Sequence, residues 1–365
     1  MAKLRVCIVG CGGISQCAHS PALKKLSDEG SVEVVAVCDI KAEKMDVVEK
    51  ILGHKVNKYT DYKEMILTEK PDMVNVCTPN YLHSEISCFA LLNGANAICE
   101  KPDAMTVKQV EDMAAAEKKG GKKLMVIRNN RYHYWSQKFK KMIDDGEFGE
   151  LYFGRCGWIR VRGIPGKGGW FTTKAQSGGG PCIDLGVHMI DLAMYLMGNP
   201  IAVSVSGSTY NKFAENTDNA DSKDATFGEK QEGGTFDVED LAGGFIKFEN
   251  GAALQFEFSW ASNIPKESSF VELRGTKKGL KWEWGWGNIF DGKPSKGGIF
   301  KLLKSAIEML KNRKFCHYEN IKHFVKVITE GIKPMYTVSQ GINMIKILNG
   351  IYESAATGKE VILNK

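Results

Sequence analysis

The chain has 365 residues, of which 43% are hydrophobic and 25% charged, and its formal net charge is +6. These are ordinary values for a globular protein, and the length predicts two domains. The mild positive charge comes without a basic block or an aromatic RNA-binding motif, so we expect no nucleic-acid partner. No apolar run reaches the roughly 18 residues of a membrane span, and we expect neither a membrane segment nor a secretory leader. Ten cysteines without a C-x-x-C pair predict reduced thiols in a cytoplasmic protein and no structural zinc.

The first 130 residues alternate between strand and helix patterns. Short apolar runs predict parallel strands that are buried on both faces, namely Leu4–Val9, Val32–Cys38, Met73–Cys77, Ala97–Cys99 and Leu124–Ile127. Helical patterns lie between them, at Lys41–Leu52, Tyr62–Glu69, His83–Asn93 and Val107–Lys119. This alternation predicts an α/β fold, a Rossmann doubly wound parallel sheet, over residues 1–130.

Residues 131–365 have a different pattern and predict an α+β domain with a large, mostly antiparallel open sheet. Phe245, Phe256 and Phe258 fit a sheet with one packed face. A free apolar face is typical of a subunit interface, so we expect a homodimer or homotetramer through this sheet. The last helices are candidates to pack back on the first domain. The predicted helices are Trp135–Asp145, Tyr318–Glu330 and Val338–Ala356, and the strands are Leu151–Val161, Ala202–Tyr210, Leu241–Phe248, Ala252–Ser259 and Ser269–Arg274.

Three segments of the second domain fit these elements less well. Asn211–Gly234 is polar and predicts a long mobile loop. Trp282–Gly298 is rich in Trp and Gly, and its pattern leaves three interpretations open: a lid, a substrate wall or an oligomer contact. Ile299–Lys314 predicts a basic amphipathic helix with a solvated face.

A glycine-rich segment, Gly10-Cys11-Gly12-Gly13-Ile14-Ser15, directly follows the first predicted strand. The first glycine permits a tight turn, and the second lets the backbone approach a pyrophosphate at the N-terminus of the next helix. Ser15 stands in place of the usual third glycine. The prediction of a dinucleotide site therefore rests mainly on the position of the motif between a strand and a helix. We expect Gly10, Gly12, Gly13 and Ile14 to contact a dinucleotide.

Asp39 ends the second predicted strand, where a carboxylate accepts both ribose hydroxyls of the adenosine half. The same charge repels the 2′-phosphate of NADP, because two like charges about 4 Å apart repel by roughly 1–4 kcal/mol at effective dielectrics of 80 down to 20. Lys41 and Lys44 follow closely and soften this repulsion. We therefore predict NAD as the cofactor and leave NADP open.

Another cofactor-facing segment begins at the carboxyl end of a predicted strand, the edge at which open α/β sheets bind ligands. Within Cys77-Thr78-Pro79-Asn80-Tyr81-Leu82-His83, we expect Thr78, Asn80 and His83 to face the cofactor. For His83, a helix N-terminal residue without a ligand is an equal alternative.

The tripeptide Glu100-Lys101-Pro102 occupies the same edge, at the end of the next strand. We expect Glu100 and Lys101 beside the cofactor. The lysine ammonium can donate a hydrogen bond to a substrate oxygen and stabilise developing alkoxide. A cis bond before Pro102 would fix the direction of the lysine. Taken alone, the tripeptide is more simply a surface lysine.

A glycine run at residues 178–180 and Pro181 precede a strongly apolar helical pattern. Asp184 and His188 lie one turn apart on one face of this helix, and Asp191 continues the polar stripe. An apolar helix is largely buried, so these polar groups need partners. Taken alone, such a pair is more often a structural hydrogen bond than a catalytic group.

Together these segments resemble the Gfo/Idh/MocA oxidoreductase family, named for glucose-fructose oxidoreductase and inositol dehydrogenase. The resemblance extends over nearly the whole chain. It rests on residues 10–15, 78–83, 100–102, 129–131, 146–149, 178–191, 240–251 and 354–358.

The resemblance implies hydride transfer between a nicotinamide and a secondary alcohol or ketone of a sugar, cyclitol or related polyol. It implies Lys101, Asp184 and His188 as the catalytic group. His188 would be the general base on the substrate hydroxyl, Asp184 would bind substrate or orient the site, and Lys101 would lower the pKa of the alcohol. No metal is expected. Polar and aromatic candidates for a carbohydrate-like substrate are Arg131, His133, Tyr134, Trp158, Arg160, Arg162, Trp170 and Phe171, beside Asp184 and His188.

Two other functions stay open at this point. One is a glycoside-cleaving enzyme that oxidises C3 transiently, eliminates the aglycone and shows no net turnover of NAD. The other is a non-catalytic sensor that binds the dinucleotide, and the intact catalytic group argues against it.

Overall fold

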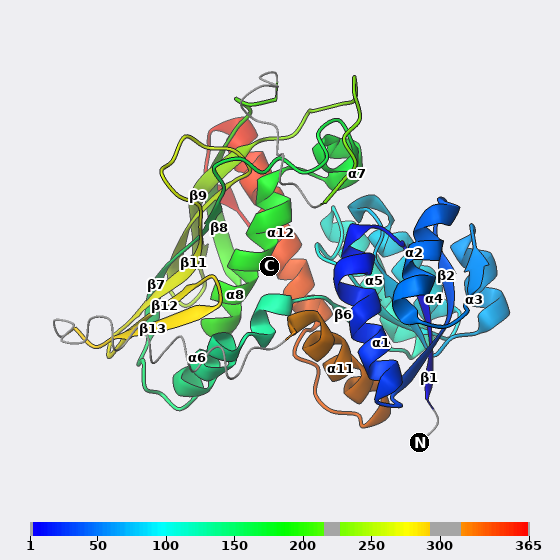
Figure 1. The fold of residues 1–365 in the computed structure, drawn as a ribbon. Helices are drawn as coiled ribbons and strands as arrows, with labels where there is room; N and C mark the ends of the chain where they lie inside the picture. Colours follow the sequence, from blue (N-terminus) through cyan, green and yellow to red (C-terminus); the bar gives the residue numbers. More distant parts are fainter. Residues whose placement is uncertain (1–2, 215–226, 293–314, 364–365) are drawn as a thin grey trace.

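The computed structural model describes residues 3–214, 227–292 and 315–363, and these residues form two sheets with helices packed between and around them (Figure 1). The predicted helix Ile299–Lys314 lies outside the described residues, as do parts of the segments 211–234 and 282–298. The described ends of the predicted loop Asn211–Gly234 contain neither helix nor strand. Within the described ranges, no helix is long and apolar enough to cross a membrane.

The first sheet confirms the predicted Rossmann fold. Its strands are parallel and run in the order β3-β2-β1-β4-β5-β6, so the chain winds outward in both directions from β1. The edge strand β3 escaped prediction because its three residues, Asn57–Tyr59, contain no apolar run. The other strands are β1 (Leu4–Val9), β2 (Val32–Cys38), β4 (Met73–Val76), β5 (Asn96–Cys99) and β6 (Leu124–Val126).

Two helices of this domain begin at residues whose side chains satisfy their free N–H groups. Asp61 accepts hydrogen bonds from Lys63 N and Glu64 N, and Thr106 forms a reciprocal capping box with Gln109. A short π-helical turn, η1 (Ser15–His19), leads from the glycine loop into the first α-helix. The helices are α1 (Ser20–Asp28), α2 (Ala42–Leu52), α3 (Tyr62–Glu69), α4 (His83–Leu92) and α5 (Val107–Gly120).

The second sheet confirms the predicted large open sheet. Its order is β13-β12-β11-β7-β10-β9-β8-β14, and every pair of neighbours is antiparallel except β7 and β10. The strands are β7 (Leu151–Ile159), β8 (Ala202–Tyr210), β9 (Leu241–Phe248), β10 (Ala253–Ser259), β11 (Ser268–Gly275), β12 (Gly279–Glu283), β13 (Trp286–Phe290) and β14 (Val361–Ile362).

Two details of this sheet differ from the prediction. Phe256 and Phe258 are buried on the helix side, but Phe245 pairs with Gln255 and is 38% exposed on the other face. Strand side chains alternate between faces, so Phe245 and Phe256 belong to opposite sides of the sheet. The described part of the segment 282–298 is the edge hairpin β12–β13, with Trp282 buried and Trp284 at its turn.

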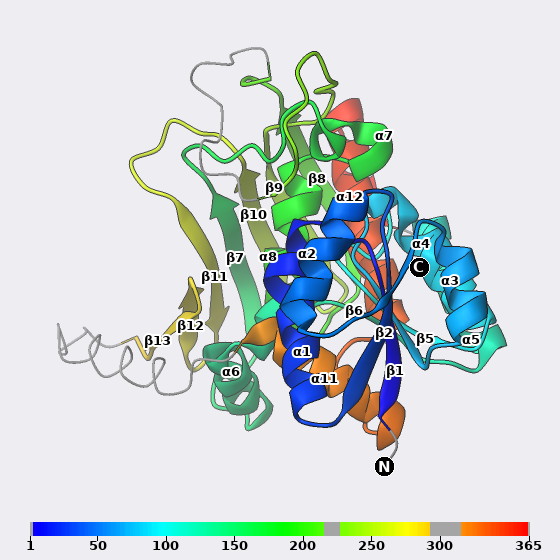
Figure 2. The same cartoon turned by 45° about the vertical axis from the view of Figure 1, so that its right-hand side comes forward.

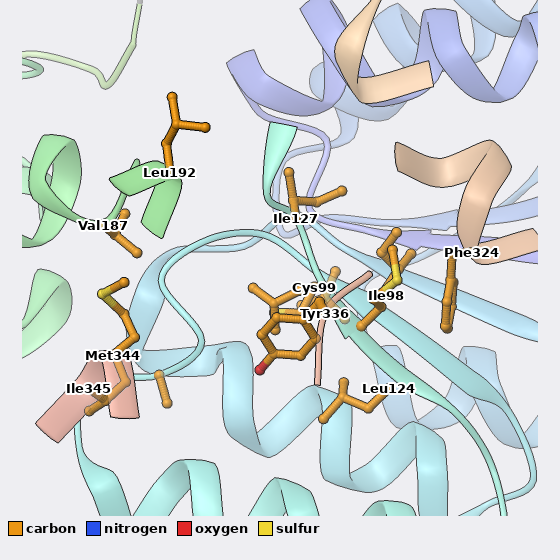
Figure 3. Packing of buried hydrophobic residues seen from close by; sticks show 14 of the residues in the cluster. Ile98, Cys99, Leu124, Ile127, Val187, Leu192, Phe324, Tyr336, Met344 and Ile345 are labelled. Carbon is orange, nitrogen blue, oxygen red and sulfur yellow. The ribbon is translucent and has the colours of Figure 1, made fainter. Parts of the chain in front are cut away.

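Helices of the second domain lie between the two sheets (Figures 1 and 2). Helix α8 packs on β7 and β11, α12 packs on β8 and α5, and α11 packs on α1. Buried apolar side chains of both domains therefore form one continuous cluster, in which Tyr336 lies among residues from both (Figure 3). The helices are α6 (Tyr134–Asp144), α7 (Lys174–Ser177), α8 (Val187–Leu196), α11 (Cys316–Thr329) and α12 (Val338–Thr357), with a π-helical turn η5 (Cys182–Gly186) before α8.

A buried ionic network joins the end of β6 to helix α8. Asp191 of α8 accepts from Arg128 Nε at 2.9 Å and from Arg131 Nε at 2.8 Å and Nη2 at 2.7 Å. Arg128 also pairs with Asp103, which accepts from the hydroxyl of Tyr336. Each of these charges is nearly fully buried and has a partner, as burial requires.

Asp191→Asn should strongly destabilise the protein, because it leaves two buried guanidinium groups short of negative charge while keeping the side-chain shape. We expect a loss of about 3–5 kcal/mol in the free energy of unfolding, measured by urea denaturation. The matched control is Asp144→Asn, which removes an exposed ion pair with Lys140 and should change stability by less than about 1 kcal/mol. Equal effects of the two substitutions would contradict a structural role for this network.

Candidate active site

The glycine loop has the geometry that a dinucleotide pyrophosphate requires. Gly10 has φ +91°, and a Cβ there would lie 2.6 Å from the carbonyl oxygen of Cys77, so only glycine fits. A Cβ on Gly12 would meet nothing within 4 Å, so the backbone beside it faces open space. Gly13 is exposed and Ile14 half-buried at the start of the first helical turn. Free N–H groups at this helix start suit an anion.

Asp39 and Thr78 flank this loop. The Asp39 carboxylate accepts from Cys11 N at 2.7 Å and Lys41 N at 2.9 Å, which fixes its position beside the glycine loop. The hydroxyl of Thr78 is buried and has no hydrogen-bond partner among the described residues. A buried donor without a partner beside open backbone fits a polar ligand at this edge of the sheet. The residues present therefore fit the predicted cofactor.

Asn80 and His83 use their side chains within the protein. Asn80 Nδ2 donates to the Ser177 carbonyl at 2.8 Å, which links the two domains. His83 is fully buried, and its ring nitrogens lie 2.7 Å from the Pro102 carbonyl and 2.9 Å from the Thr78 carbonyl. Both ring nitrogens are occupied within the protein, so the side chain ties residues 78–83 to the loop that carries Lys101. The expectation that His83 faces the cofactor stays a prediction.

Glu100 likewise faces inward. Its carboxylate is buried and accepts from His19 Nε2 at 2.6 Å, while His317 Nε2 lies 3.6 Å away. Burial alone would raise the pKa of this carboxyl, but hydrogen bonds from the two histidines hold it well below the usual range. His19 accepts from Asn75 Nδ2 at 2.9 Å through its other nitrogen. The sequence pattern did not single out His19 or His317.

Lys101 of the first domain meets Asp184 of the second. Its Nζ lies 2.7 Å from Asp184 Oδ1 and 3.2 Å from the Asp184 carbonyl oxygen, and the predicted cis bond to Pro102 is present. Trp260 Nε1 donates to the other carboxylate oxygen at 3.0 Å. Burial raises the pKa of Asp184, but the charges of Lys101 and Arg160 outweigh it and lower the pKa to about 2. Asp184 is therefore ionised at neutral pH.

His188 lies one helical turn beyond Asp184. Burial, together with the positive charge of Lys101, lowers the pKa of His188 to about 3, so the imidazole is neutral. A neutral imidazole beside an ammonium group can accept a proton from a bound hydroxyl. The indole of Trp158 lies near it, with ring centroids 5.8 Å apart.

The helix that carries both residues is held by a buried carboxylate. Glu239 accepts from Gly180 N at 2.9 Å and Cys182 N at 3.0 Å, and the Tyr352 hydroxyl donates to it at 2.8 Å. A Cβ on Gly180 would lie 2.0 Å from the Glu239 carbonyl oxygen. A side chain at residue 180 would therefore clash with the backbone of Glu239, which explains the glycine there. The carboxylate of Glu239 satisfies N–H groups at the start of the helix.

Aromatic groups surround the same place on the second domain. Trp158 packs edge-on against Trp284 with ring centroids 5.9 Å apart, and the guanidinium of Arg160 lies 5.2 Å from the Trp158 ring. The Trp158 Nε1 is buried without a partner among the described residues. Trp284 is 44% exposed at φ +49°, an unusual conformation for a bulky residue.

The remaining predicted substrate residues lie in other settings. Trp170 and Phe171 stack with ring centroids 3.8 Å apart, and Tyr134 begins α6 edge-on against Trp135. Arg131 is 1% exposed and donates to Asp191, Gln340 and the Met335 carbonyl, and its expected substrate contact stays a prediction. Arg162 donates to the carbonyls of Val161 and Ser262.

Comparisons with known proteins match both domains of the chain to one family. A family model described as an oxidoreductase family with an NAD-binding Rossmann fold matches residues 4–128, and one described as a GFO/IDH/MocA C-terminal domain matches residues 136–281. The D-glucoside 3-dehydrogenase of Escherichia coli K12 is 32% identical over 364 residues, which cover 99% of this chain and 97% of that protein.

Solved structures share the fold over the whole chain. A levoglucosan dehydrogenase in complex with NADH has a TM-score of 0.82 at 22% identity and covers 100% of both chains. The WlbA dehydrogenase of Bordetella pertussis, in complex with NADH and UDP-GlcNAcA, has a TM-score of 0.80 at 20% identity and covers 100% of this chain and 98% of that one. The chain belongs to the Gfo/Idh/MocA oxidoreductase family, and its N-terminal domain is an NAD-binding Rossmann fold.

Proposed function

We propose that this protein is an NAD-dependent dehydrogenase that oxidises a secondary alcohol of a sugar or related polyol, or reduces the corresponding ketone, with Lys101, Asp184 and His188 as its catalytic group. One observation carries the proposal. The Lys101 ammonium of the cofactor domain lies 2.7 Å from the carboxylate of Asp184, on the helical segment that carries His188. A cation, an anion and a neutral base thus converge at the carboxyl edge of a dinucleotide-binding sheet.

Each group has a distinct role in this proposal. Lys101 donates a hydrogen bond to the substrate oxygen and stabilises the negative charge that develops there. Neutral His188 accepts the hydroxyl proton. Asp184, fixed by Lys101 and by the indole N–H of Trp260, keeps the ammonium in place. The glycine loop and Asp39 would hold NAD, which when bound would supply the acceptor for the hydride of the carbinol carbon. In the reductive direction the proton transfers reverse.

The aromatic surroundings support a carbohydrate-like substrate. Trp158 has a buried indole N–H without a described partner, and Arg160 and Trp284 pack against its ring. A pyranose offers hydroxyl oxygens to the indole N–H of Trp158 and apolar C–H faces to the aromatic rings. Relatives named for D-glucosides and levoglucosan support the same class. We place Trp158, Arg160, Trp170 and Tyr134 on the substrate side and Thr78 on the cofactor side.

The central test is a panel of sugars, cyclitols and glycosides offered with NAD, following the absorbance of reduced nicotinamide. With an accepted substrate, Lys101→Ala and His188→Ala should each lower kcat by about 10²–10⁴-fold, because each removes a group that acts on the reacting oxygen. Lys108→Ala, on an exposed face of α5, is the matched control and should keep full activity. Full activity of either active-site variant would contradict the mechanism. Release of the aglycone from a glycoside with only catalytic amounts of NAD would contradict net oxidation or reduction of the sugar as the reaction.

The neutral state of His188 predicts a pH dependence of stability. Its pKa in the folded protein, about 3, lies below the roughly 6.5 of an unfolded chain. The unfolded state therefore binds more protons between these values, so this contribution is fully present above pH 6.5 and is lost as the pH falls toward 3. The free energy of unfolding should fall less steeply in His188→Gln than in the wild type between pH 6.5 and 4.5. Parallel slopes would mean that His188 is not held neutral.

The domain division, assembly and location are part of the same proposal. We place the boundary near residue 130, between the two matched family segments. Ten free thiols, most of them buried, fit a reducing cytoplasm. We propose that subunits pair through the outer face of the eight-stranded sheet, where the rings of Phe153 and Phe245 lie 6.0 Å apart.

Phe245→Glu should dissociate this assembly, because it places a charge at the centre of the outer sheet face. Sedimentation velocity should show a smaller species for Phe245→Glu and an unchanged one for the control Glu249→Gln, beyond the end of β9. A wild-type monomer, or an unchanged oligomer in Phe245→Glu, would contradict pairing through this face.

A further inference from the structure

A carboxylate of the second domain reaches across to two lysines of the cofactor domain. Glu229 lies 2.6 Å from Lys41 Nζ and 2.7 Å from Lys44 Nζ. These lysines stand two and five residues after Asp39, the carboxylate at the end of β2. The interaction therefore lies at the adenosine end of the predicted cofactor position, away from Lys101 and Asp184.

The backbone around Glu229 is fixed by close contacts with residues 166–169. A Cβ on Gly166 would lie 2.8 Å from the Gly228 backbone, and a Cβ on Gly168 would lie 2.0 Å from the Gln231 carbonyl oxygen. Gln231 N donates to the Lys167 carbonyl at 2.9 Å. The two backbone segments thus pack directly against each other with no side chain between them. This packing restricts the position of Glu229 more than that of an isolated surface carboxylate.

The charges of this cluster are strongly coupled. Hydrogen bonds from Lys41 and Lys44 lower the pKa of Glu229 to about 2, so it is fully ionised at neutral pH. Lys41 and Lys44 are the cations that follow Asp39 closely, and a 2′-phosphate needs such cations nearby. The carboxylate of Glu229 contacts both ammonium groups, so it occupies the cations with which a 2′-phosphate would pair.

We infer that Glu229 is a specificity-determining residue, which selects NAD against NADP from the second domain by holding Lys41 and Lys44. It removes the two cations that would pair with a 2′-phosphate, and it adds a second negative charge to that of Asp39. The selection against NADP is thus shared between a residue of the Rossmann domain and one that lies 190 positions later in the chain. The inference rests on the proposed use of NAD by this domain.

The test measures binding, independently of any substrate. NADH and NADPH are titrated at low ionic strength into the wild type, Glu229→Gln and the matched control Glu232→Gln, following nicotinamide fluorescence. Glu232 lies exposed on the same segment. Glu229→Gln should tighten the Kd of NADPH about tenfold and change that of NADH less than about twofold. Glu232→Gln should match the wild type.

A combined variant tests the mechanism. In Lys41→Ala/Lys44→Ala/Glu229→Gln, the gain in NADPH binding should disappear, because no cation is left to release. The inference would be overturned if the ratio of the Kd values of NADPH and NADH were unchanged in Glu229→Gln. It would also be overturned if the tighter NADPH binding persisted in the combined variant. The proposed function would stand in both cases, provided that the wild type binds NADH. Absence of NADH binding to the wild type would overturn both.

Discussion

The ion pair between Lys101 and Asp184 is the interaction on which the site depends. It joins the NAD-binding domain to the second domain, and both side chains are only partly accessible, at 18% and 15% exposure. Removing either charge of such an enclosed pair would leave the other without compensation. The neighbouring groups that hold the two side chains in place therefore matter as much as the pair itself. The ammonium also helps to keep the nearby His188 neutral. Burial and this contact together set the charge state of the proposed catalytic group.

The groups behind this pair are themselves buried and paired. On the first domain, Glu100 next to Lys101 is held between His19 and His317. On the second, Glu239 holds the start of the helical segment that carries Asp184 and His188. Further along that helix, Asp191 is locked by two arginines. Buried charges are stable only with such partners, so the rigidity of the site follows from satisfying them.

Sequence patterns predicted the residues at strand ends and on one helix face, because strand alternation and helical spacing fix local direction. They did not predict Glu239 and Trp260, which reach Asp184 and its helix from distant parts of the chain. They also missed β3, which has no apolar run, and β14, which has only two residues. The partner of Asp191 was not predicted for a related reason. A carboxylate on an apolar helix requires a buried cation, but no local pattern joins Asp191 to Arg131.

Lysine–carboxylate contacts cross between the domains at both ends of the predicted cofactor position, and they differ in their exposure to solvent. Lys101 and Asp184 are mostly enclosed, whereas Lys41 and Glu229 are 42% and 54% exposed. Salt screens exposed pairs effectively and enclosed ones much less. The selectivity that we infer at the adenosine end rests on exposed ion pairs, so it should change with ionic strength. The enclosed pair of Lys101 and Asp184 should respond to ionic strength much less.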